Sequence, residues 1–212
     1  TDFDQNYSHR CFTRFYGFDM SKGKIIGLVY EYMSNGSLKN FISKNDVNPI
    51  FQFTSLMRIY QGLKFLQKNS LIHRDLKPGN ILIDHDWNAY ISDFETIRST
   101  EEDISKDCGS VSFVSPEQFA GVDEITFKTD IYSFGGLIYV LFEKKDWFDV
   151  KRLSVSEIDQ LKKNNNYPEM TNCTEKICQL YHQCIKNNQN ERPGLEKIKN
   201  VICEETKPDH LL

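Results

Sequence analysis

The sequence lacks a strong charge of either sign and lacks any long apolar run. Its 26 Lys and Arg against 30 Asp and Glu give a net charge of −4, so it has no basic surplus for general nucleic-acid binding. The longest nearly apolar stretch, Ile131 to Phe142, is too short to cross a bilayer and predicts a buried helix. We therefore expect no nucleic-acid partner and no membrane insertion.

Signals for export and for disulfide bonding are missing as well. No signal peptide opens the chain. The six cysteines form no CxxC metal pair, and a chain of 212 residues does not need disulfides to fold. We expect reduced thiols and a cytoplasmic location.

The remaining composition is that of a globular protein whose pattern changes along the chain. Hydrophobic residues make up 39% and charged residues 26%, and the length allows a sizeable core. Two apolar, β-branched stretches, Phe12 to Phe18 and Ile25 to Tyr30, flank a turn-like cluster and predict a β-hairpin. A short helix is expected at Leu38 to Ser43.

The later chain is predicted to be mainly helical. Residues Phe53 to Lys68 repeat apolar side chains every three or four positions, as one face of a helix does. Short strands are expected at 81–83 and 90–91, followed by a polar surface loop over 96–112. From Pro116 onward helices dominate, so the fold class is α+β.

The octapeptide His73-Arg74-Asp75-Leu76-Lys77-Pro78-Gly79-Asn80 resembles the catalytic loop H-R-D-L-x-x-x-N of eukaryotic protein kinases. In that family the resemblance implies that Asp75 orients the substrate hydroxyl and that Lys77 stabilises charge on the transferred phosphoryl group. It implies that Asn80 supplies an oxygen to Mg²⁺.

Ser92-Asp93-Phe94-Glu95 resembles the D-F-G element, whose Asp holds Mg²⁺, so the resemblance gives this role to Asp93. Glu95 stands where the family has glycine, which removes conformational freedom and adds a negative charge near the metal.

The nonapeptide from Gly109 to Glu117 resembles the end of a kinase activation segment. The resemblance implies that Ser110 hydrogen-bonds Asp75 and Lys77 and helps to shape the substrate site. It also implies an ion pair between Glu117 and Arg192. It further implies that Asp130, in Asp130-Ile131-Tyr132-Ser133-Phe134-Gly135, accepts hydrogen bonds from the backbone around His73 and Arg74.

The stretch from Leu28 to Leu38 resembles the hinge between the two kinase lobes, in a form close to the tyrosine-kinase-like group of Ser/Thr kinases. By this resemblance Glu31 and Met33 offer backbone groups to adenine, Tyr30 is the gatekeeper and Leu82 is the pocket floor. For Tyr30, ordinary core packing is an equal alternative.

Two family elements are missing: the loop G-x-G-x-x-G over the ATP phosphates and the strand Lys in a V-A-I-K-like context. We therefore expect a partial protein kinase domain. Residues 1–33 are the remnant of the small lobe and hinge, residues 34–205 the large lobe and residues 206–212 a tail.

The leading hypothesis is an ATP- and Mg²⁺-dependent kinase that phosphorylates Ser or Thr of a protein substrate, with the 212 residues alone having little or no activity. The alternative is a pseudokinase or regulatory module that docks partners through the large lobe. A metal hydrolase using His73 and the cluster Asp84-His85-Asp86 is a third class, although that cluster is better explained as a polar turn.

Overall fold

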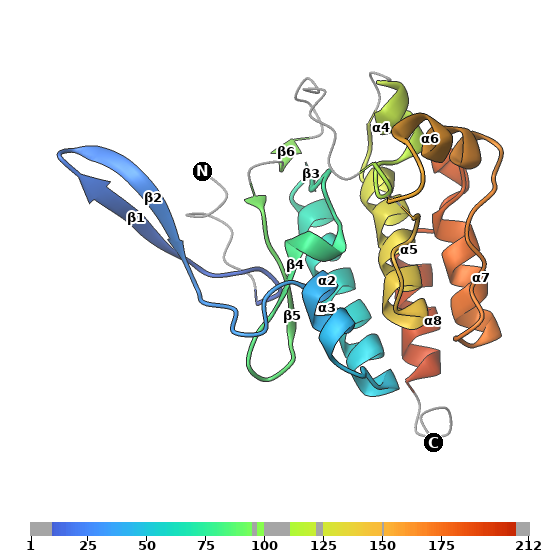
Figure 1. The fold of residues 1–212 in the computed structure, drawn as a ribbon, viewed down its shortest axis with the longest axis horizontal. Coiled ribbons are helices and arrows are strands. Elements are labelled where there is room, and N and C mark those ends of the chain that lie inside the picture. The colour runs from blue at the N-terminus through green and yellow to red at the C-terminus, as the bar shows by residue number, and fades with distance from the viewer. Residues whose placement is uncertain (1–9, 95–96, 100–110, 122–124, 150, 207–212) are drawn as a thin grey trace.

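The computed structural model describes residues 10–94, 97–99, 111–121, 125–149 and 151–206, and it shows a β-hairpin extending from a mainly helical body (Figure 1). Strands β1 (Phe15–Ser21) and β2 (Lys24–Tyr30) form this antiparallel hairpin. The turn between them has positive φ at Lys22 (50°) and Gly23 (77°), as tight hairpin turns require. The predicted hairpin is confirmed. The first strand was predicted at 12–18 but runs over Phe15–Ser21, because the turn takes up only Lys22 and Gly23 of the polar cluster between the two strands.

The helical body begins with α2 (Leu38–Lys44) and α3 (Pro49–Lys68). Helix α3 starts four residues before the expected Phe53. The reason is local: the side chain of Asn48 accepts a hydrogen bond from the backbone N of Phe51 at 2.9 Å, and proline is favourable in the first helical turn.

Four short strands follow in two antiparallel pairs, β3 with β6 and β4 with β5. Their bounds are β3 (Leu71–Ile72), β4 (Ile81–Ile83), β5 (Ala89–Ile91) and β6 (Arg98–Ser99), and the single-turn helix η1 (Pro78–Asn80) precedes β4. The prediction that residues 96–112 form an exposed surface loop is wrong for the described residues at each end of this range. Ile97 joins the hydrophobic core and Ser112 is buried, so these positions are covered by the body.

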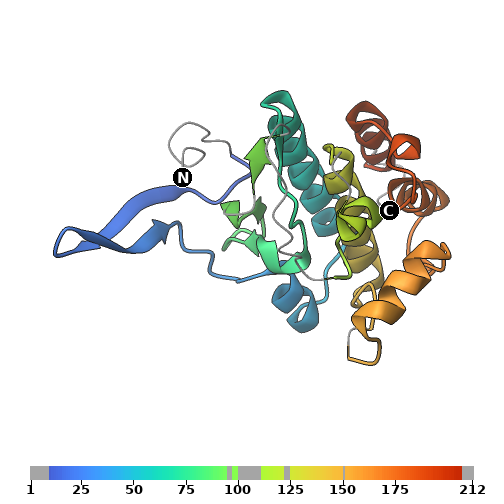
Figure 2. The ribbon, with the colours of Figure 1, turned by 90° about the horizontal axis from the view of Figure 1, so that it is seen from above.

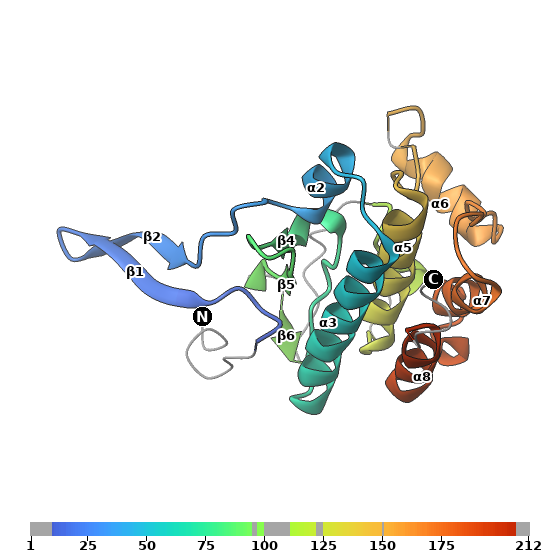
Figure 3. The ribbon, with the colours of Figure 1, turned by 90° about the horizontal axis from the view of Figure 1, so that it is seen from below.

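The second half of the body is helical, as expected. Its elements are α4 (Pro116–Ala120), α5 (Lys128–Glu143), α6 (Val155–Lys163), α7 (Glu175–Cys184), η3 (Gln189–Glu191) and α8 (Leu195–Glu205). Helix α5 contains the predicted buried stretch and packs against both α3 and α7, as the view from above shows (Figure 2). Helix α8 completes the bundle by packing on α3 and α7 (Figure 3).

Apolar side chains are buried in the helical body but largely exposed on the hairpin. The largest fully buried side chains, among them Trp147, Tyr132 and Tyr181, belong to the helical body. On the hairpin, seven large apolar side chains remain exposed: Tyr16, Phe18, Met20, Ile25, Ile26, Leu28 and Val29. The body is therefore the part that burial stabilises, at roughly 25 cal/mol per Å² of apolar surface.

Candidate active site

The residues predicted to be catalytic lie together on the segment between β3 and β4. The ammonium of Lys77 forms an ion pair with the Asp75 carboxylate at 2.5 Å. The amide nitrogen of Asn80 donates to the same carboxylate at 2.9 Å and to the backbone oxygen of Asp75 at 2.9 Å. The side chains of Lys77 and Asp75 are only 23% and 12% exposed, so their charges interact with little screening by solvent.

Asp93 joins this cluster from the strand side. The amide nitrogen of Asn80 also donates to the Asp93 carboxylate, at 3.0 Å, so one amide group links the two carboxylates. Asp93 has a positive φ of 67°, a backbone conformation that is costly for a residue with a side chain and that is often found at functional sites. The carboxylate of Asp93 and the amide oxygen of Asn80 are hard oxygen donors, and they fit a hard divalent cation.

Asp130 fixes the loop that carries these residues. Its carboxylate accepts hydrogen bonds from the backbone N of His73 at 2.8 Å and of Arg74 at 2.9 Å, which confirms the prediction. Burial raises the pKa of Asp130, whereas the nearby His73 and Arg74 oppose the increase. Arg74 has a positive φ of 69°, and the two hydrogen bonds to Asp130 support this turn.

The imidazole of His73 connects the loop to the strand that precedes Asp93. His73 is fully buried, and its Nε2 lies 3.0 Å from the backbone oxygen of Ser92. Its Nδ1 accepts from the backbone N of Asp75 at 3.4 Å, so the ring fits the tautomer with the proton on Nε2. Ser92 in turn donates from its hydroxyl to the backbone oxygen of Asn80 at 3.0 Å. These bonds set the distance between the two carboxylates.

The end of the predicted activation segment is held against the same loop. Gln118 donates from its side-chain nitrogen to the backbone oxygen of Arg74 at 2.8 Å. Glu117 and Arg192 form the predicted ion pair through two N–O contacts of 2.6 Å. Burial raises the pKa of Glu117, but the hydrogen bonds and charge of Arg192 outweigh it, so the pKa is lowered overall. The prediction of this pair is confirmed.

The four residues predicted to contact the nucleotide lie near the junction of hairpin and body. The Tyr30 ring packs 6.0 Å from that of Phe94, next to Asp93, so it has the apolar contacts of a core residue. Leu82 is half-buried and forms an isolated bridge with Ser37, which precedes α2.

The hinge backbone already has hydrogen bonds of its own. Glu31 donates its backbone N to Arg14, and the backbone oxygen of Met33 accepts from Gly36. These two groups are therefore not offered to adenine in this conformation.

The kinase resemblance also matches Phe15, His73 and Phe94 to members of a hydrophobic stack that links the two lobes. In the structure the Phe15 ring contacts Tyr30 at 5.3 Å, and Tyr30 in turn contacts Phe94. Phe12 also packs against Phe94, at 5.8 Å. Tyr30 therefore lies between Phe15 and Phe94 in this chain of rings.

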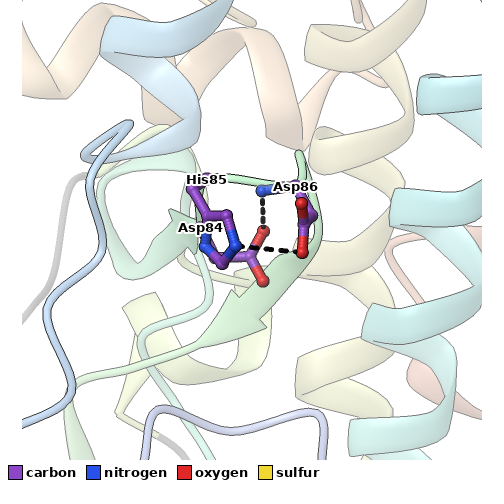
Figure 4. Close-up of side chains that lie close together, drawn as sticks. All are labelled: Asp84, His85 and Asp86. Carbon is purple, nitrogen blue, oxygen red and sulfur yellow. Dashed lines mark hydrogen bonds and ion pairs between the residues drawn. The ribbon is translucent and has the colours of Figure 1, made fainter.

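The cluster Asp84, His85 and Asp86 brings its ligand atoms within 4.8 Å of one another (Figure 4). The Asp84 carboxylate accepts from the backbone N of Asp86 at 2.9 Å and of Asn88 at 2.8 Å, and from the Tyr90 hydroxyl at 3.1 Å. These bonds close the turn between β4 and β5. The arrangement is that of the polar turn expected from the sequence, with an exposed His85 beside it.

Two positions predicted from the sequence lie outside the described residues, and two contacts near the site were not predicted from the sequence. Glu95 and Ser110 fall outside the described residues. The sequence reasoning missed Gln118, whose place after the Pro-Glu pair could have suggested a contact with the loop. It also missed Lys162, which carries no signal in the sequence because nothing local marks a helical lysine as buried.

Comparison with known proteins agrees with this geometry. The family model described as the protein kinase domain matches residues 2–202. The chain therefore belongs to the protein kinase family. Members of this family transfer a phosphoryl group from ATP with the help of a divalent cation. Within the described residues, no helix is both long enough and apolar enough to cross a membrane.

The most similar relatives come from several kinds of kinase. A probable serine/threonine-protein kinase of Dictyostelium discoideum is 29% identical over 178 residues, which is 81% of this chain and 12% of the relative. The probable serine/threonine-protein kinase kinX of the same organism is 27% identical over 202 residues (92% and 18%). Human ephrin type-A receptor 5 is 28% identical over 192 residues (86% and 18%). The chain spans less than a fifth of each of these relatives.

Proposed function

We propose that this chain carries the catalytic machinery of a protein kinase that transfers the γ-phosphoryl group of ATP to Ser or Thr hydroxyls of protein substrates. The observation that carries the proposal is the Asn80 amide, which links the Asp75 and Asp93 carboxylates at 2.9 and 3.0 Å. A carboxylate that orients the hydroxyl and a carboxylate that binds the metal, held side by side by one amide, are what in-line phosphoryl transfer needs. The names of two relatives in Dictyostelium discoideum favour Ser and Thr as acceptors.

Each residue of the cluster has a role that its contacts suit. Asp75 orients the substrate hydroxyl and accepts its hydrogen bond. Lys77, held 2.5 Å from Asp75, places a positive charge where the transferred phosphoryl group becomes more negative. Asp93 and Asn80 supply oxygen ligands to Mg²⁺, which neutralises the phosphates when it is bound.

The nucleotide is expected to lie between the hinge and this cluster, with Tyr30 as gatekeeper, Leu82 below the adenine and the backbone of Glu31 and Met33 at its edge. The backbone N of Glu31 and the oxygen of Met33 already take part in hydrogen bonds within the chain, so the adenine edge is expected to use the backbone oxygen of Glu31 and the backbone N of Met33. The 212 residues contain no G-x-G-x-x-G loop, so we expect weak nucleotide binding and slow transfer.

Calorimetric titration of the chain with ATP, in the presence of Mg²⁺ or of EDTA, tests the proposal. We expect weak binding that requires Mg²⁺ and is lost in Asp93→Asn, and slow radiolabel transfer to a degenerate Ser/Thr peptide library that is lost in Asp75→Asn. Asp86→Asn, an exposed carboxylate in the turn between β4 and β5, is the matched control and keeps both signals. Absence of Mg²⁺-dependent ATP binding at millimolar nucleotide would refute the proposal.

The second candidate is a docking module that acts through the large lobe. It is favoured by Glu95, which stands where the kinase family has glycine and adds a negative charge next to Asp93 in the sequence. It predicts no ATP binding and no effect of Asp75→Asn on partner capture. The same titration therefore separates the two candidates.

A further inference from the structure

Lys162 on α6 is buried, although lysine is almost never fully buried without a partner. Only 2% of its surface is exposed. Its ammonium donates to the backbone oxygens of Val111 and Val114, both at 2.7 Å. These two residues lie at the end of the predicted activation segment, about 50 positions earlier in the chain.

Three aromatic rings surround the same ammonium. It lies 5.3 Å from the ring centre of Tyr132, 5.9 Å from that of Trp147 and 5.8 Å from that of Phe148. A cation at this distance from a ring is attracted by its electrons, and the attraction is greater away from water. The two carbonyl oxygens and the three rings therefore stabilise the charged form of Lys162, whereas its burial opposes that form.

The segment from Val111 to Val114 depends on side chains for its shape. The ammonium of Lys162 donates to the backbone oxygens of Val111 and Val114. The hydroxyl of Ser133 on α5 donates to the backbone oxygen of Phe113 at 2.8 Å. Polar backbone groups without a regular ladder need such partners. Three of the four carbonyls in this segment are therefore held by side chains of α5 and α6.

We propose that Lys162 is a positioning residue for the protein substrate: it fixes the backbone of Val111–Val114 in the shape that presents the substrate to Asp75. The inference rests on the proposed function, because it gives that site a residue that determines substrate binding. The connection to the site is direct, since the same segment continues into Gln118, which binds the backbone of Arg74.

The charge of Lys162 depends on the groups packed around it. Asp159 on α6 and Glu117 on α4 act on its charge, the ring of Tyr132 on α5 faces its ammonium, and Tyr167 after α6 is hydrogen-bonded to Tyr132. Asp159 pairs with Lys163 at 2.6 Å and Glu117 with Arg192, while burial keeps the two phenols neutral by raising their pKa. Burial lowers the pKa of Lys162 to about 7, and Asp159 and Glu117 oppose this change.

A neutral amine keeps two N–H donors but loses its attraction to the rings. Burial nevertheless makes the pKa of Lys162 lower here than in an arrangement that exposes the amine, so loss of the proton favours the buried arrangement, and the hold on the segment should strengthen as the pH rises through about 7.

Hydrogen exchange of the backbone amides in 111–118 tests the structural part without ATP. In Lys162→Met we expect exchange in this segment to be roughly tenfold faster at pH 6, as loss of charged hydrogen bonds predicts, and Lys162→Arg to restore part of the protection. Lys163→Met, a change at the neighbouring exposed lysine, is the matched control. Unchanged α5 and α8 amides show that the variant is folded. Equal exchange in wild type and Lys162→Met overturns the inference.

Trp147 reports the protonation of Lys162 directly. Trp87→Phe leaves Trp147 as the single tryptophan, because the chain has only two. We expect its fluorescence to titrate with a midpoint near pH 7, and this transition to disappear in Trp87→Phe combined with Lys162→Met. A transition that persists without Lys162 overturns the proposed dependence on this residue.

The effect on substrate binding is measured by comparing KM values in the radiolabel transfer assay with the Ser/Thr peptide library. Lys162→Met should raise KM for the peptide library roughly tenfold and leave KM for ATP unchanged. An unchanged peptide KM overturns the positioning role. A wild-type chain that transfers no label counts against the proposed function, and the exchange experiment then decides the inference about Lys162.

Discussion

Replacing Arg192 with methionine removes the charge that balances a buried carboxylate. The guanidinium is fully buried and its partner Glu117 is 8% exposed, with two N–O contacts of 2.6 Å between them. Arg192 also donates to the backbone oxygens of Lys186 at 2.8 Å, Lys128 at 2.9 Å and Asn187 at 3.2 Å. The variant removes the guanidinium donor from all of these acceptors and leaves Glu117 the hydrogen bond from the Thr129 hydroxyl.

The size of the effect follows from this geometry. Removing one partner of a buried ion pair costs about 3–5 kcal/mol, because the remaining charge stays buried. Lys176→Met is the matched control: Lys176 pairs with Glu204 at 2.8 Å, but both side chains are 50% exposed. An exposed pair contributes about 0–1 kcal/mol.

Urea unfolding followed by tryptophan fluorescence measures both changes. With a slope of about 2–3 kcal/mol per molar urea, Arg192→Met should lower the midpoint by roughly 1–2 M, and Lys176→Met by less than about 0.5 M. An Arg192→Met midpoint within about 0.3 M of the control would show that the pair does not stabilise the lobe.

The same pair gives a pH dependence with a definite sign. The pKa of Glu117 in the folded chain lies below its ordinary 4.5, so the stabilisation is present above pH 4.5 and is lost as the pH falls through the lowered pKa. Wild-type stability should therefore fall below pH 4.5 more steeply than that of Glu117→Gln. Parallel curves for the two proteins would contradict this account.

Three further changes test the site and the packing. Under the proposed function Asp75→Asn should abolish phosphoryl transfer, while its melting temperature stays within a few degrees of wild type because asparagine keeps a side-chain oxygen that can accept from Lys77 and Asn80. Gly136→Ala should cost about 1–3 kcal/mol in urea unfolding because a methyl group there meets the Trp147 ring, whereas Gly194→Ala, which meets nothing, should not show this packing cost. Asp84→Ala should lower stability by about 1–2 kcal/mol without changing the response to Mg²⁺, and a large Mg²⁺ effect there would mean a metal site rather than a turn.

The local sequence was enough to predict most elements and the members of the site. Apolar residues every three or four positions in α3 indicated a helix buried on one face. The continuous apolar stretch in α5 indicated a helix buried on all faces. The loop from His73 to Asn80 and the later Asp93 were singled out because they resemble the catalytic loop and the D-F-G element of protein kinases. The start of α3 was missed although Asn48 and Pro49 carry an ordinary N-terminal signal.

What the sequence determined by itself is therefore the residue types of the candidate site and the existence of most helices. Only the tertiary structure decided that Asn80 links two carboxylates, that Tyr30 packs on Phe94, and that Lys162 is buried under the segment from Val111 to Val114. The physical reason is distance along the chain. The contacts of Asn80 with Asp93, of Tyr30 with Phe94 and of Lys162 with Val111 join residues 13, 64 and 51 positions apart, so they depend on how separate elements pack, and no local pattern of residues records that packing.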